Sequence, residues 1–435
     1  MKDENNTPYD LGILNGKVYL EGGFISTNIY VKDQKVSTLS SQELPCKKEV
    51  DAKGCMVLPG LIDPHVHFKL GVGERVSSDD FYEGSRKGAL GGITTYIDFL
   101  DPVKKAAEIE AAFQKRLLLA KDSLTDYAFH TTIANPDDNA QDIIDASKKV
   151  GIKSIKLFTT YSDTDRRTKD GAIYDLLTCS RDTDIKIVIH AENDELVSSK
   201  KDILVKDHEA SRPVLSETVE IMKLASMARV TKGNLYIVHV SAGSSVKQLV
   251  QLFPEELEKR QILLESCPHY FIFDSSVYEK EEGYRYTMTP PLRPDKEREL
   301  LNECIDFVTT IGTDHCPCAT DLKRQTYTSQ IFMGVDGIQY SFLNMFTRFG
   351  EAILDKYTLE PAKAYGLYPR KGSLLPGADA DVLIFDPKEL TTVEDTDSIY
   401  DGYKLQGAVK KVFLRGELIV EEEKIFPMTG SYIRR

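Results

Sequence analysis

Residues 57–68 have the sequence VLPGLIDPHVHF, an apolar stretch that ends in polar and imidazole side chains. Apolar stretches of similar character recur as far as residue 313, and charge-rich segments separate them. Stretches of this kind predict strands that are buried on both faces of a sheet. We expect eight of them, over Val57–Phe68, Thr94–Phe99, Tyr127–Ile133, Ser154–Thr160, Ile185–His190, Leu235–Val240, Ile262–Cys267 and Phe307–Thr313.

Segments with helical spacing of apolar residues lie between these strands. The clearest are Val103–Ala120, Ala140–Val150, Ser216–Val230, Ser245–Leu252 and Asp295–Cys304. Strands that alternate with helices predict a parallel sheet covered by helices. Eight such units over about 320 residues are typical of a (β/α)8 TIM barrel. The chain contains neither GxGxxG nor GxxxxGK(S/T), which disfavours an open nucleotide-binding sheet.

The two ends of the chain have a different pattern. Short apolar stretches broken by Asn-Gly and Gly-Gly turns come before the first barrel strand. Similar stretches return over Ala380–Phe385 and Lys411–Leu418. We expect the two ends to pair with each other. The predicted α/β architecture is therefore a barrel over residues 56–372, beside a small β-sandwich domain formed by residues 1–55 and 373–435.

Composition excludes several classes of protein. The 435 residues include 68 acidic and 55 basic side chains, a net charge of −13, with no basic stripe of the kind that binds nucleic acid. No stretch approaches the ~18 consecutive apolar residues of a membrane span. The polar N-terminus shows no secretory signal, and the seven cysteines are scattered and odd in number. These features predict a cytoplasmic protein with reduced thiols, without a nucleic-acid or membrane partner.

Several histidines fall where the predicted strands end. His65 and His67 are two residues apart on the first strand, so their imidazoles face the same side. His190 ends the fifth strand, His239 lies near the end of the sixth, and Asp314 follows the eighth. Taken singly, each histidine fits a hydrogen-bonded core residue better than a metal ligand. Because active sites of such barrels lie at the carboxyl ends of the strands, the five together predict one site.

Lys156 interrupts the apolar fourth strand, in the sequence SIKLF. One interpretation is a lysine whose stem covers apolar surface while its ammonium group reaches water. The other is a buried amine that has lost its proton. A neutral amine can add carbon dioxide and become a carbamate, an anion whose two oxygens can bridge two cations. The strand position alone leaves both interpretations open.

These motifs resemble the cyclic-amidase branch of the amidohydrolase superfamily, and within it the dihydropyrimidinases and D-hydantoinases. The resemblance rests on PGLIDPHVHF at 59–68, on the downstream lysine, histidines and aspartate, on PAK and GLYPRKG within 361–372, and on GADAD at 377–381. It extends over almost the whole chain. It implies two Zn²⁺ ions, held by His65, His67 and Asp314 on one side, by His190 and His239 on the other, and bridged by carboxylated Lys156.

The resemblance also implies a mechanism. The two metals share a water, lower its pKa and provide a hydroxide that attacks the carbonyl carbon of a cyclic amide. Asp314 is expected to carry the proton to the leaving nitrogen, and Tyr161 to donate to the developing oxyanion. Thr289, in the sequence TPPLR, takes the place of a serine that binds the ring. Met333 replaces a polar side chain that often helps to hold the imide, and packing against the substrate is its expected role.

Dihydropyrimidines and 5-substituted hydantoins are the expected substrates. Allantoinase and dihydroorotase activities remain alternatives within the same chemistry. Dihydroorotases typically carry an arginine and an asparagine where this chain has Lys69 and Thr289, which disfavours an acidic substrate. The loop over residues 70–76 departs from the usual hydantoinase sequence, so the preferred ring substituent is undetermined.

Two further classes are weaker. Non-catalytic dihydropyrimidinase-like scaffolds have lost their metal ligands, whereas all six ligand positions are filled in this sequence. A mononuclear deaminase on the same barrel would lack the position of Lys156 and carry a glutamate after the fifth-strand histidine, a place that Glu192 could take. Similar enzymes are commonly homotetramers or homodimers, and one of these assemblies is expected.

Overall fold

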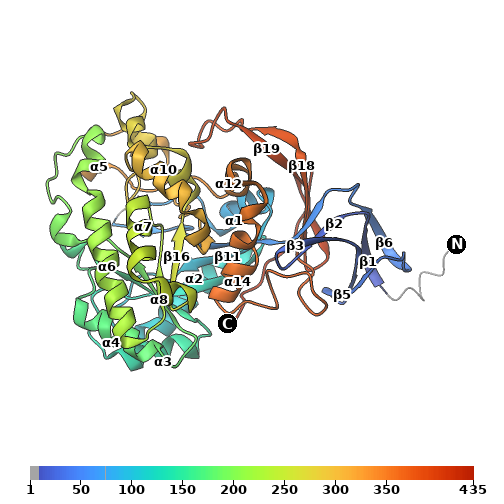
Figure 1. The fold of residues 1–435 in the computed structure, drawn as a ribbon, viewed down its shortest axis with the longest axis horizontal. Helices are drawn as coiled ribbons and strands as arrows, with labels where there is room; N and C mark the ends of the chain where they lie inside the picture. Colours follow the sequence, from blue (N-terminus) through green and yellow to red (C-terminus); the bar gives the residue numbers. More distant parts are fainter. Residues whose placement is uncertain (1–8, 74) are drawn as a thin grey trace.

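A computed structural model describes residues 9–73 and 75–435, and its centre is an eight-stranded parallel sheet (Figure 1). Neighbouring strands follow one another in chain order. Nearly all of their side chains are buried, as expected for a sheet covered on both faces. The strands are β8 (Leu61–Val66), β11 (Ile93–Phe99), β12 (Asp126–Thr132), β13 (Ser154–Phe158), β14 (Lys186–His190), β15 (Leu235–Ile237), β16 (Ile262–Ser266) and β17 (Thr310–Ile311).

Main-chain contacts close this sheet into a barrel. Val66, the last residue of β8, pairs in parallel with His315, which follows β17. The amide of Asp314 donates to the carbonyl of His65 at 2.9 Å, and the amide of His67 donates to that of His315 at 2.9 Å. The predicted α/β barrel is confirmed, and its closing seam includes three of the proposed metal ligands.

Helices surround the barrel (Figure 1). In α3, the side chain of Asn139 caps the first turn by accepting from the amide of Asp142, and Ile143, Ile144 and Ser147 are buried on one face. None of the helices in the described residues is both long and apolar enough to cross a membrane. The helices are α1 (Phe81–Leu90), α2 (Ile109–Leu119), α3 (Ala140–Lys149), α4 (Asp170–Ser180), α5 (His208–Ser211), α6 (Val214–Thr231), α7 (Gly243–Leu252), α8 (Pro254–Glu258), α9 (Pro268–Ile272), α10 (Asp295–Glu303), α11 (Thr320–Lys323), α12 (Ser341–Phe349), α13 (Leu354–Tyr357) and α14 (Leu359–Ala364).

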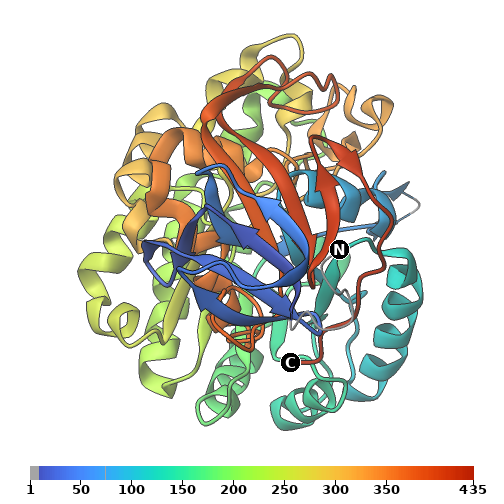
Figure 2. The same ribbon diagram turned by 90° about the vertical axis from the view of Figure 1, so that its right-hand side faces the viewer.

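Two further sheets lie beside the barrel and face the viewer in Figure 2. One has the order β5 (Lys35–Ser40), β4 (Asn28–Lys32), β1 (Tyr9–Leu14), β6 (Cys46–Asp51). The other has the order β21 (Lys424–Ile425), β20 (Glu417–Glu421), β19 (Lys404–Leu414), β18 (Val382–Thr392), β7 (Met56–Pro59), β2 (Lys17–Leu20), β3 (Gly23–Ser26). Apolar side chains from both sheets form one core, and strands from both ends of the chain share the second sheet.

The apolar stretch 57–68, which the sequence predicts as one strand, forms two. It divides at Gly60 into β7, which pairs with β18 and β2, and β8, which belongs to the barrel. The amide of Gly60 donates to the carbonyl of Asp381 at 2.8 Å, and a Cβ at this position would collide with the side chain of Thr94. The chain therefore needs a glycine where it passes from one sheet to the other.

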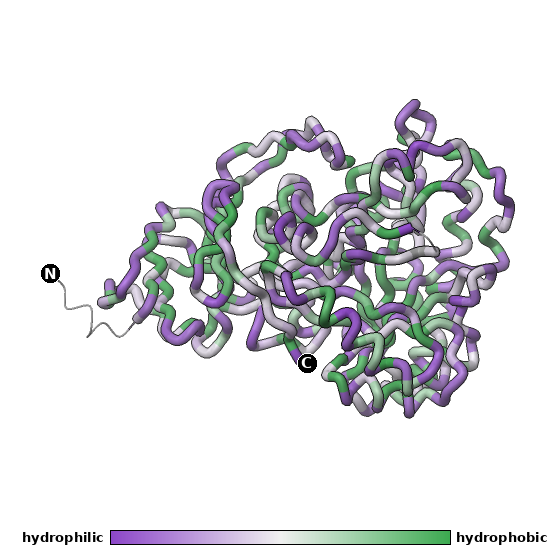
Figure 3. The backbone as a smooth tube through the Cα atoms, turned by 180° about the vertical axis from the view of Figure 1, so that it is seen from behind, coloured by the Kyte–Doolittle hydropathy of each residue, from purple (hydrophilic) through white to green (hydrophobic). Residues whose placement is uncertain are grey.

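A buried cluster of charges joins the barrel to the second sheet. The Nζ of Lys371 lies 2.6 Å from an oxygen of Asp126 on β12 and 2.5 Å from an oxygen of Asp381, next to β18. It also lies 3.0 Å from Asp379. Hydrophobic segments run through much of the interior (Figure 3), where an uncompensated carboxylate is costly. Asp126 also pairs with Arg415, and Asp379 with Lys35 and Arg370, whereas Lys371 is the only cation paired with Asp381 among the described residues.

We expect Lys371→Met to destabilise the fold by about 3–5 kcal/mol, because it leaves buried carboxylates without this cation. Urea unfolding followed by circular dichroism would measure the change. Lys121→Met, at a largely exposed lysine 3.9 Å from Asp122, should change the stability by less than about 0.5 kcal/mol. Equal stabilities of the two variants would contradict the role given to Lys371.

Candidate metal centre and active site

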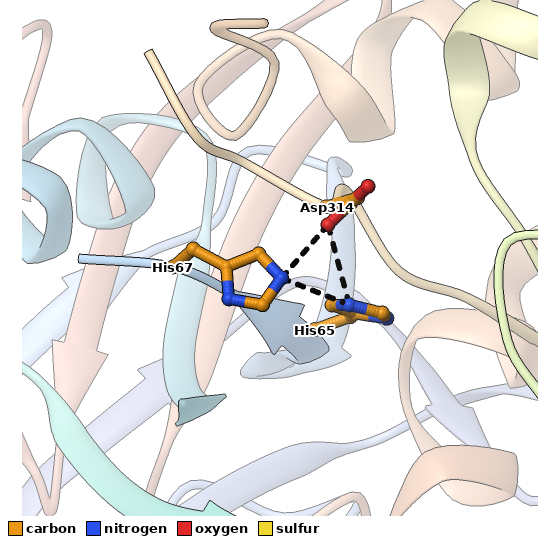
Figure 4. A group of neighbouring side chains, drawn as sticks. All are labelled: His65, His67 and Asp314. Atoms are coloured by element: carbon orange, nitrogen blue, oxygen red, sulfur yellow. Dashed lines mark hydrogen bonds and ion pairs between the residues drawn. The ribbon is translucent and has the colours of Figure 1, made fainter. Parts of the chain in front are cut away.

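Three side chains converge at the carboxyl end of the barrel, where β8 meets the segment after β17 (Figure 4). The Nε2 atoms of His65 and His67 lie 3.2 Å apart. Asp314 Oδ1 lies 3.2 Å from the first and 3.0 Å from the second. All three ligand atoms lie within 4.8 Å of one another. Two imidazole nitrogens and a carboxylate oxygen are a donor set that Zn²⁺ accepts, so the side chains fit a metal site.

A second pair of imidazoles lies beside this cluster. His190 is the last residue of β14, and its Nδ1 lies 3.0 Å from the Nε2 of His239. The ring centroid of His239 lies 5.5 Å from that of His65. His239 has a φ of 40°, a left-handed conformation that is uncommon for a residue other than glycine. His190, at the end of β14, and His239, shortly after β15 (Leu235–Ile237), thus add a pair of nitrogens next to the first three donors.

Lys156 lies on β13, is 2% exposed and lines the same cavity as these five side chains. Its Nζ lies 5.3 Å from the ring centroid of Phe99 and 5.5 Å from that of Phe158. Burial lowers the pKa of Lys156 to about 8, although Asp314 and Glu265 oppose this shift. A substantial fraction of the amine is therefore neutral near pH 8, which is the form that can add carbon dioxide.

The charges in the first cluster depend on one another. Burial raises the pKa of Asp314, but His65 and His67 outweigh this effect and hold it well below its ordinary range. Burial lowers the pKa of His65, but Glu265 and Asp314 prevail and raise it to about 9. In His190 burial prevails and lowers the pKa to about 4. Positive charge is thus favoured beside Asp314, and the His190 imidazole stays neutral, as a metal ligand must.

Glu265 orients the first imidazole, a role for which the sequence did not single it out. Its Oε1 lies 2.6 Å from the Nδ1 of His65, and the hydroxyl of Tyr236 donates to its Oε2 at 2.8 Å. A carboxylate that accepts from one ring nitrogen fixes the ring and leaves the other nitrogen free to coordinate. The feature of the sequence that could have pointed to this role is a glutamate inside the apolar strand β16, because a buried carboxylate needs partners.

Glu192 is placed to orient an imidazole of the second pair, that of His190. Its Oε2 lies 2.7 Å from the Nε2 of His190 and 2.5 Å from a guanidinium nitrogen of Arg212. The sequence raised Glu192 only as the glutamate of a deaminase. Because its carboxylate is committed to a histidine and an arginine, it is placed to orient His190, which weakens the deaminase alternative.

A cavity of about 720 Å³ opens beside the cluster, and the six proposed metal ligands, Tyr161, Thr289 and Met333 all line it, whereas Lys69 and Glu192 do not. The hydroxyl oxygens of Tyr161 and Thr289 lie 2.8 Å apart. The ring centroid of Tyr161 lies 5.2 Å from that of His190. Met333 lines the cavity on a segment that comes after the barrel strands. The cavity therefore brings together the proposed ligands, a phenol, a hydroxyl and an apolar side chain.

A family model described as the amidohydrolase family matches residues 56–419. The chain belongs to this family. It is 29% identical over 442 residues to a D-phenylhydantoinase of Escherichia coli O81 (strain ED1a), with 94% of each chain covered. It is 26% identical to a D-hydantoinase of Ralstonia pickettii, with 98% and 99% covered. A solved D-hydantoinase (dihydropyrimidinase) from Thermus sp. superposes with a TM-score of 0.90 at 27% identity over 98% of this chain and 99% of that one.

Membership of the amidohydrolase family confirms the resemblance drawn from the motifs. The shared fold extends beyond the barrel to the two adjoining sheets, because the structural match covers nearly the whole chain. Amidohydrolases generally use a metal, and the three-residue cluster of His65, His67 and Asp314 is a possible place for one.

Proposed function

We propose that this amidohydrolase hydrolyses the cyclic amide C–N bond of dihydropyrimidines or 5-substituted hydantoins. The observation that carries the proposal is the convergence of His65, His67 and Asp314, with the imidazoles of His190 and His239 beside them, on one cavity. The near full-length similarity to D-phenylhydantoinase and D-hydantoinase supports the ring class.

Two Zn²⁺ ions are the proposed cofactors. His65, His67 and Asp314 would hold one, His190 and His239 the other, and carboxylated Lys156 would bridge them. The nitrogen and oxygen donors suit zinc, and the depressed pKa of Lys156 suits carboxylation. When bound, the pair of cations would supply a nucleophile from water near neutral pH and polarise the ring carbonyl.

The side chains around the cavity take the remaining tasks. Asp314 faces the two histidines through Oδ1, which leaves Oδ2 to accept a proton and return it to the leaving ring nitrogen. The hydroxyl of Tyr161 would donate to the carbonyl oxygen as negative charge develops on it. Thr289 holds the phenol in place and contacts the ring, and Met333 packs against the substrate.

We expect Tyr161→Phe to lower kcat by about 10²–10³-fold, because it removes one donor to the developing oxyanion and keeps the aromatic ring. Steady-state kinetics with hydantoin would measure the change. Zinc content should stay the same, because Tyr161 is not among the proposed ligands. A rise in KM with an unchanged kcat would show that the phenol only binds the ring.

A substrate panel separates the proposed reaction from its nearest alternatives. Hydrolysis of dihydrouracil and hydantoin is expected to exceed that of allantoin and dihydroorotate. Preference for either of the latter two would favour an allantoinase or a dihydroorotase. A zinc-loaded protein that opens none of the four rings would instead favour the non-catalytic scaffold, which the complete set of ligand side chains in the cavity disfavours.

We also propose a cytoplasmic location and a homotetrameric or homodimeric assembly, as in similar enzymes. Light scattering coupled to gel filtration would measure the mass of the assembly. A mass close to 48.9 kDa would show a monomer and contradict the proposed assembly.

A further inference from the structure

Some cationic side chains that line the active-site cavity have no carboxylate partner in the part of the chain that the structure describes. Arg75, Arg166 and Lys200 all line the cavity. Across residues 9–73 and 75–435, no carboxylate forms an ion pair with any of the three; Arg75 donates to the carbonyl of Gln330 and Arg166 to the hydroxyl of Thr164. Because the whole chain has a net charge of −13, unpaired positive charge at this place is not a consequence of composition.

The acidic side chains nearby do not neutralise these cations. Asp163 lies 3.4 Å from the Nζ of Lys201, and Asp194 lies 3.2 Å from a guanidinium nitrogen of Arg167. Asp194 also accepts from the amide and hydroxyl of Ser162. Each carboxylate is thus already engaged with a neighbour, and the electrostatic field at this part of the cavity favours an anion.

Arg166 is the cation best placed to contact a substrate. Its guanidinium carbon lies 4.4 Å from the ring centroid of Tyr161, the proposed oxyanion donor. It lies 5.7 Å from the ring centroid of Phe158, and the Nζ of Lys156 lies 5.5 Å from the same centroid. The guanidinium and the amine of the proposed metal bridge therefore both lie close to the same aromatic ring. Among the described atoms, the only hydrogen bond of the Arg166 guanidinium group is the one from Nε to Thr164, so both Nη groups have donors to offer.

We propose that the physiological substrate is a cyclic ureide whose exocyclic substituent ends in a carboxylate, and that Arg166 binds this carboxylate. The inference rests on the proposed ring-opening function and adds the class of substituent. A guanidinium presents two parallel N–H donors that match a carboxylate, and half-burial strengthens the pair. An apolar substituent would cover the guanidinium and give it no acceptor in return. Arg75 and Lys200 would attract the anion to the cavity.

This inference changes the expectation drawn from the sequence. The absence of an arginine directly after the His-x-His motif disfavoured an acidic substrate, and Lys69 was the remaining candidate there. Lys69 is exposed and is not among the residues that line the cavity. The cations that do line it come from other segments, and they would meet a carboxylate on a chain that extends from the ring.

The test compares 5-(2-carboxyethyl)hydantoin with 5-(2-carbamoylethyl)hydantoin, which have nearly the same shape and differ in charge. The wild-type protein is expected to favour the acid in kcat/KM by about tenfold or more at low salt. The preference should shrink at about 1 M salt, where charges are screened beyond about 3 Å. Calorimetric titration of the zinc-free protein with both compounds gives the same comparison as a ratio of Kd values, without turnover.

Arg166→Gln should lower the acid-to-amide ratio by about tenfold, and Arg166→Lys should restore part of it. An effect of the substitution on Tyr161 would change the values for the acid and the amide alike, so it cancels in the acid-to-amide ratio. Arg181→Gln, which removes an equal charge from an exposed arginine paired with Asp182, should leave the ratio unchanged. A wild-type ratio near one, or a ratio that Arg166→Gln leaves unaltered, overturns this inference and leaves the ring-opening function intact. If the protein opens neither compound nor unsubstituted hydantoin, the proposed ring-opening function is refuted. In that case the ratio of the two Kd values alone decides whether Arg166 binds a carboxylate.

Discussion

Lys156→Ala is expected to release both metals and to lower kcat/KM by ~10⁴-fold or more, because the bridging anion and the metal-derived nucleophile are lost together. The side chain is buried on β13, and its amine lines the cavity that holds the other proposed ligands. Elemental analysis of the purified variant and hydantoin hydrolysis measure the two effects. Acetate or propionate should restore part of both, since a small carboxylate can occupy the space of the carbamate.

Lys323→Met provides a matched control for Lys156→Ala. Lys323 is also a buried lysine whose pKa burial lowers to about 8, but its Nζ donates to the carbonyls of Arg285 and Thr287. This variant should keep both metals. If Lys156→Ala also kept both metals and its activity, the lysine would not be the bridge.

The protonation state of Lys156 predicts how the metal centre assembles. The amine has a folded pKa of about 8, below its ordinary value, so it is largely protonated at pH 6 and largely neutral at pH 9. Zinc-free protein should therefore recover activity with zinc and bicarbonate faster at the higher pH. Recovery that did not depend on bicarbonate would contradict carboxylation.

Asp314→Asn is expected to lower kcat by about 10²–10⁴-fold, the range for a lost general acid and base. The amide keeps the shape of the side chain and an oxygen near His65 and His67, but it cannot carry the proton. Steady-state kinetics together with zinc analysis measure the result. If the variant keeps its zinc and its full kcat, another group must transfer the proton.

The barrel and the candidate site could both be predicted from the sequence, and for the same reason. His190 is the last residue of an apolar strand and Asp314 comes shortly after another, and parallel strands of a closed barrel end at one edge. Local pattern and order along the chain therefore sufficed to bring them to one cavity.

Other features depend on contacts between segments that are distant in sequence. Gly60 divides one apolar stretch into two strands because of Thr94 and Asp381, which no local pattern reveals. Glu265 accepts from an imidazole 200 residues away in the chain. The sequence did not single out Arg166, because only the fold shows that it lies against Tyr161 and has no carboxylate partner among the described residues.

Diffraction data from zinc-loaded crystals, collected at the zinc absorption edge, test the central claim most directly. The account predicts two anomalous peaks per protomer, one beside His65, His67 and Asp314 and one beside His190 and His239, with branched density on the Nζ of Lys156 reaching both. A single peak, or an unmodified amine turned away from the metals, would contradict it.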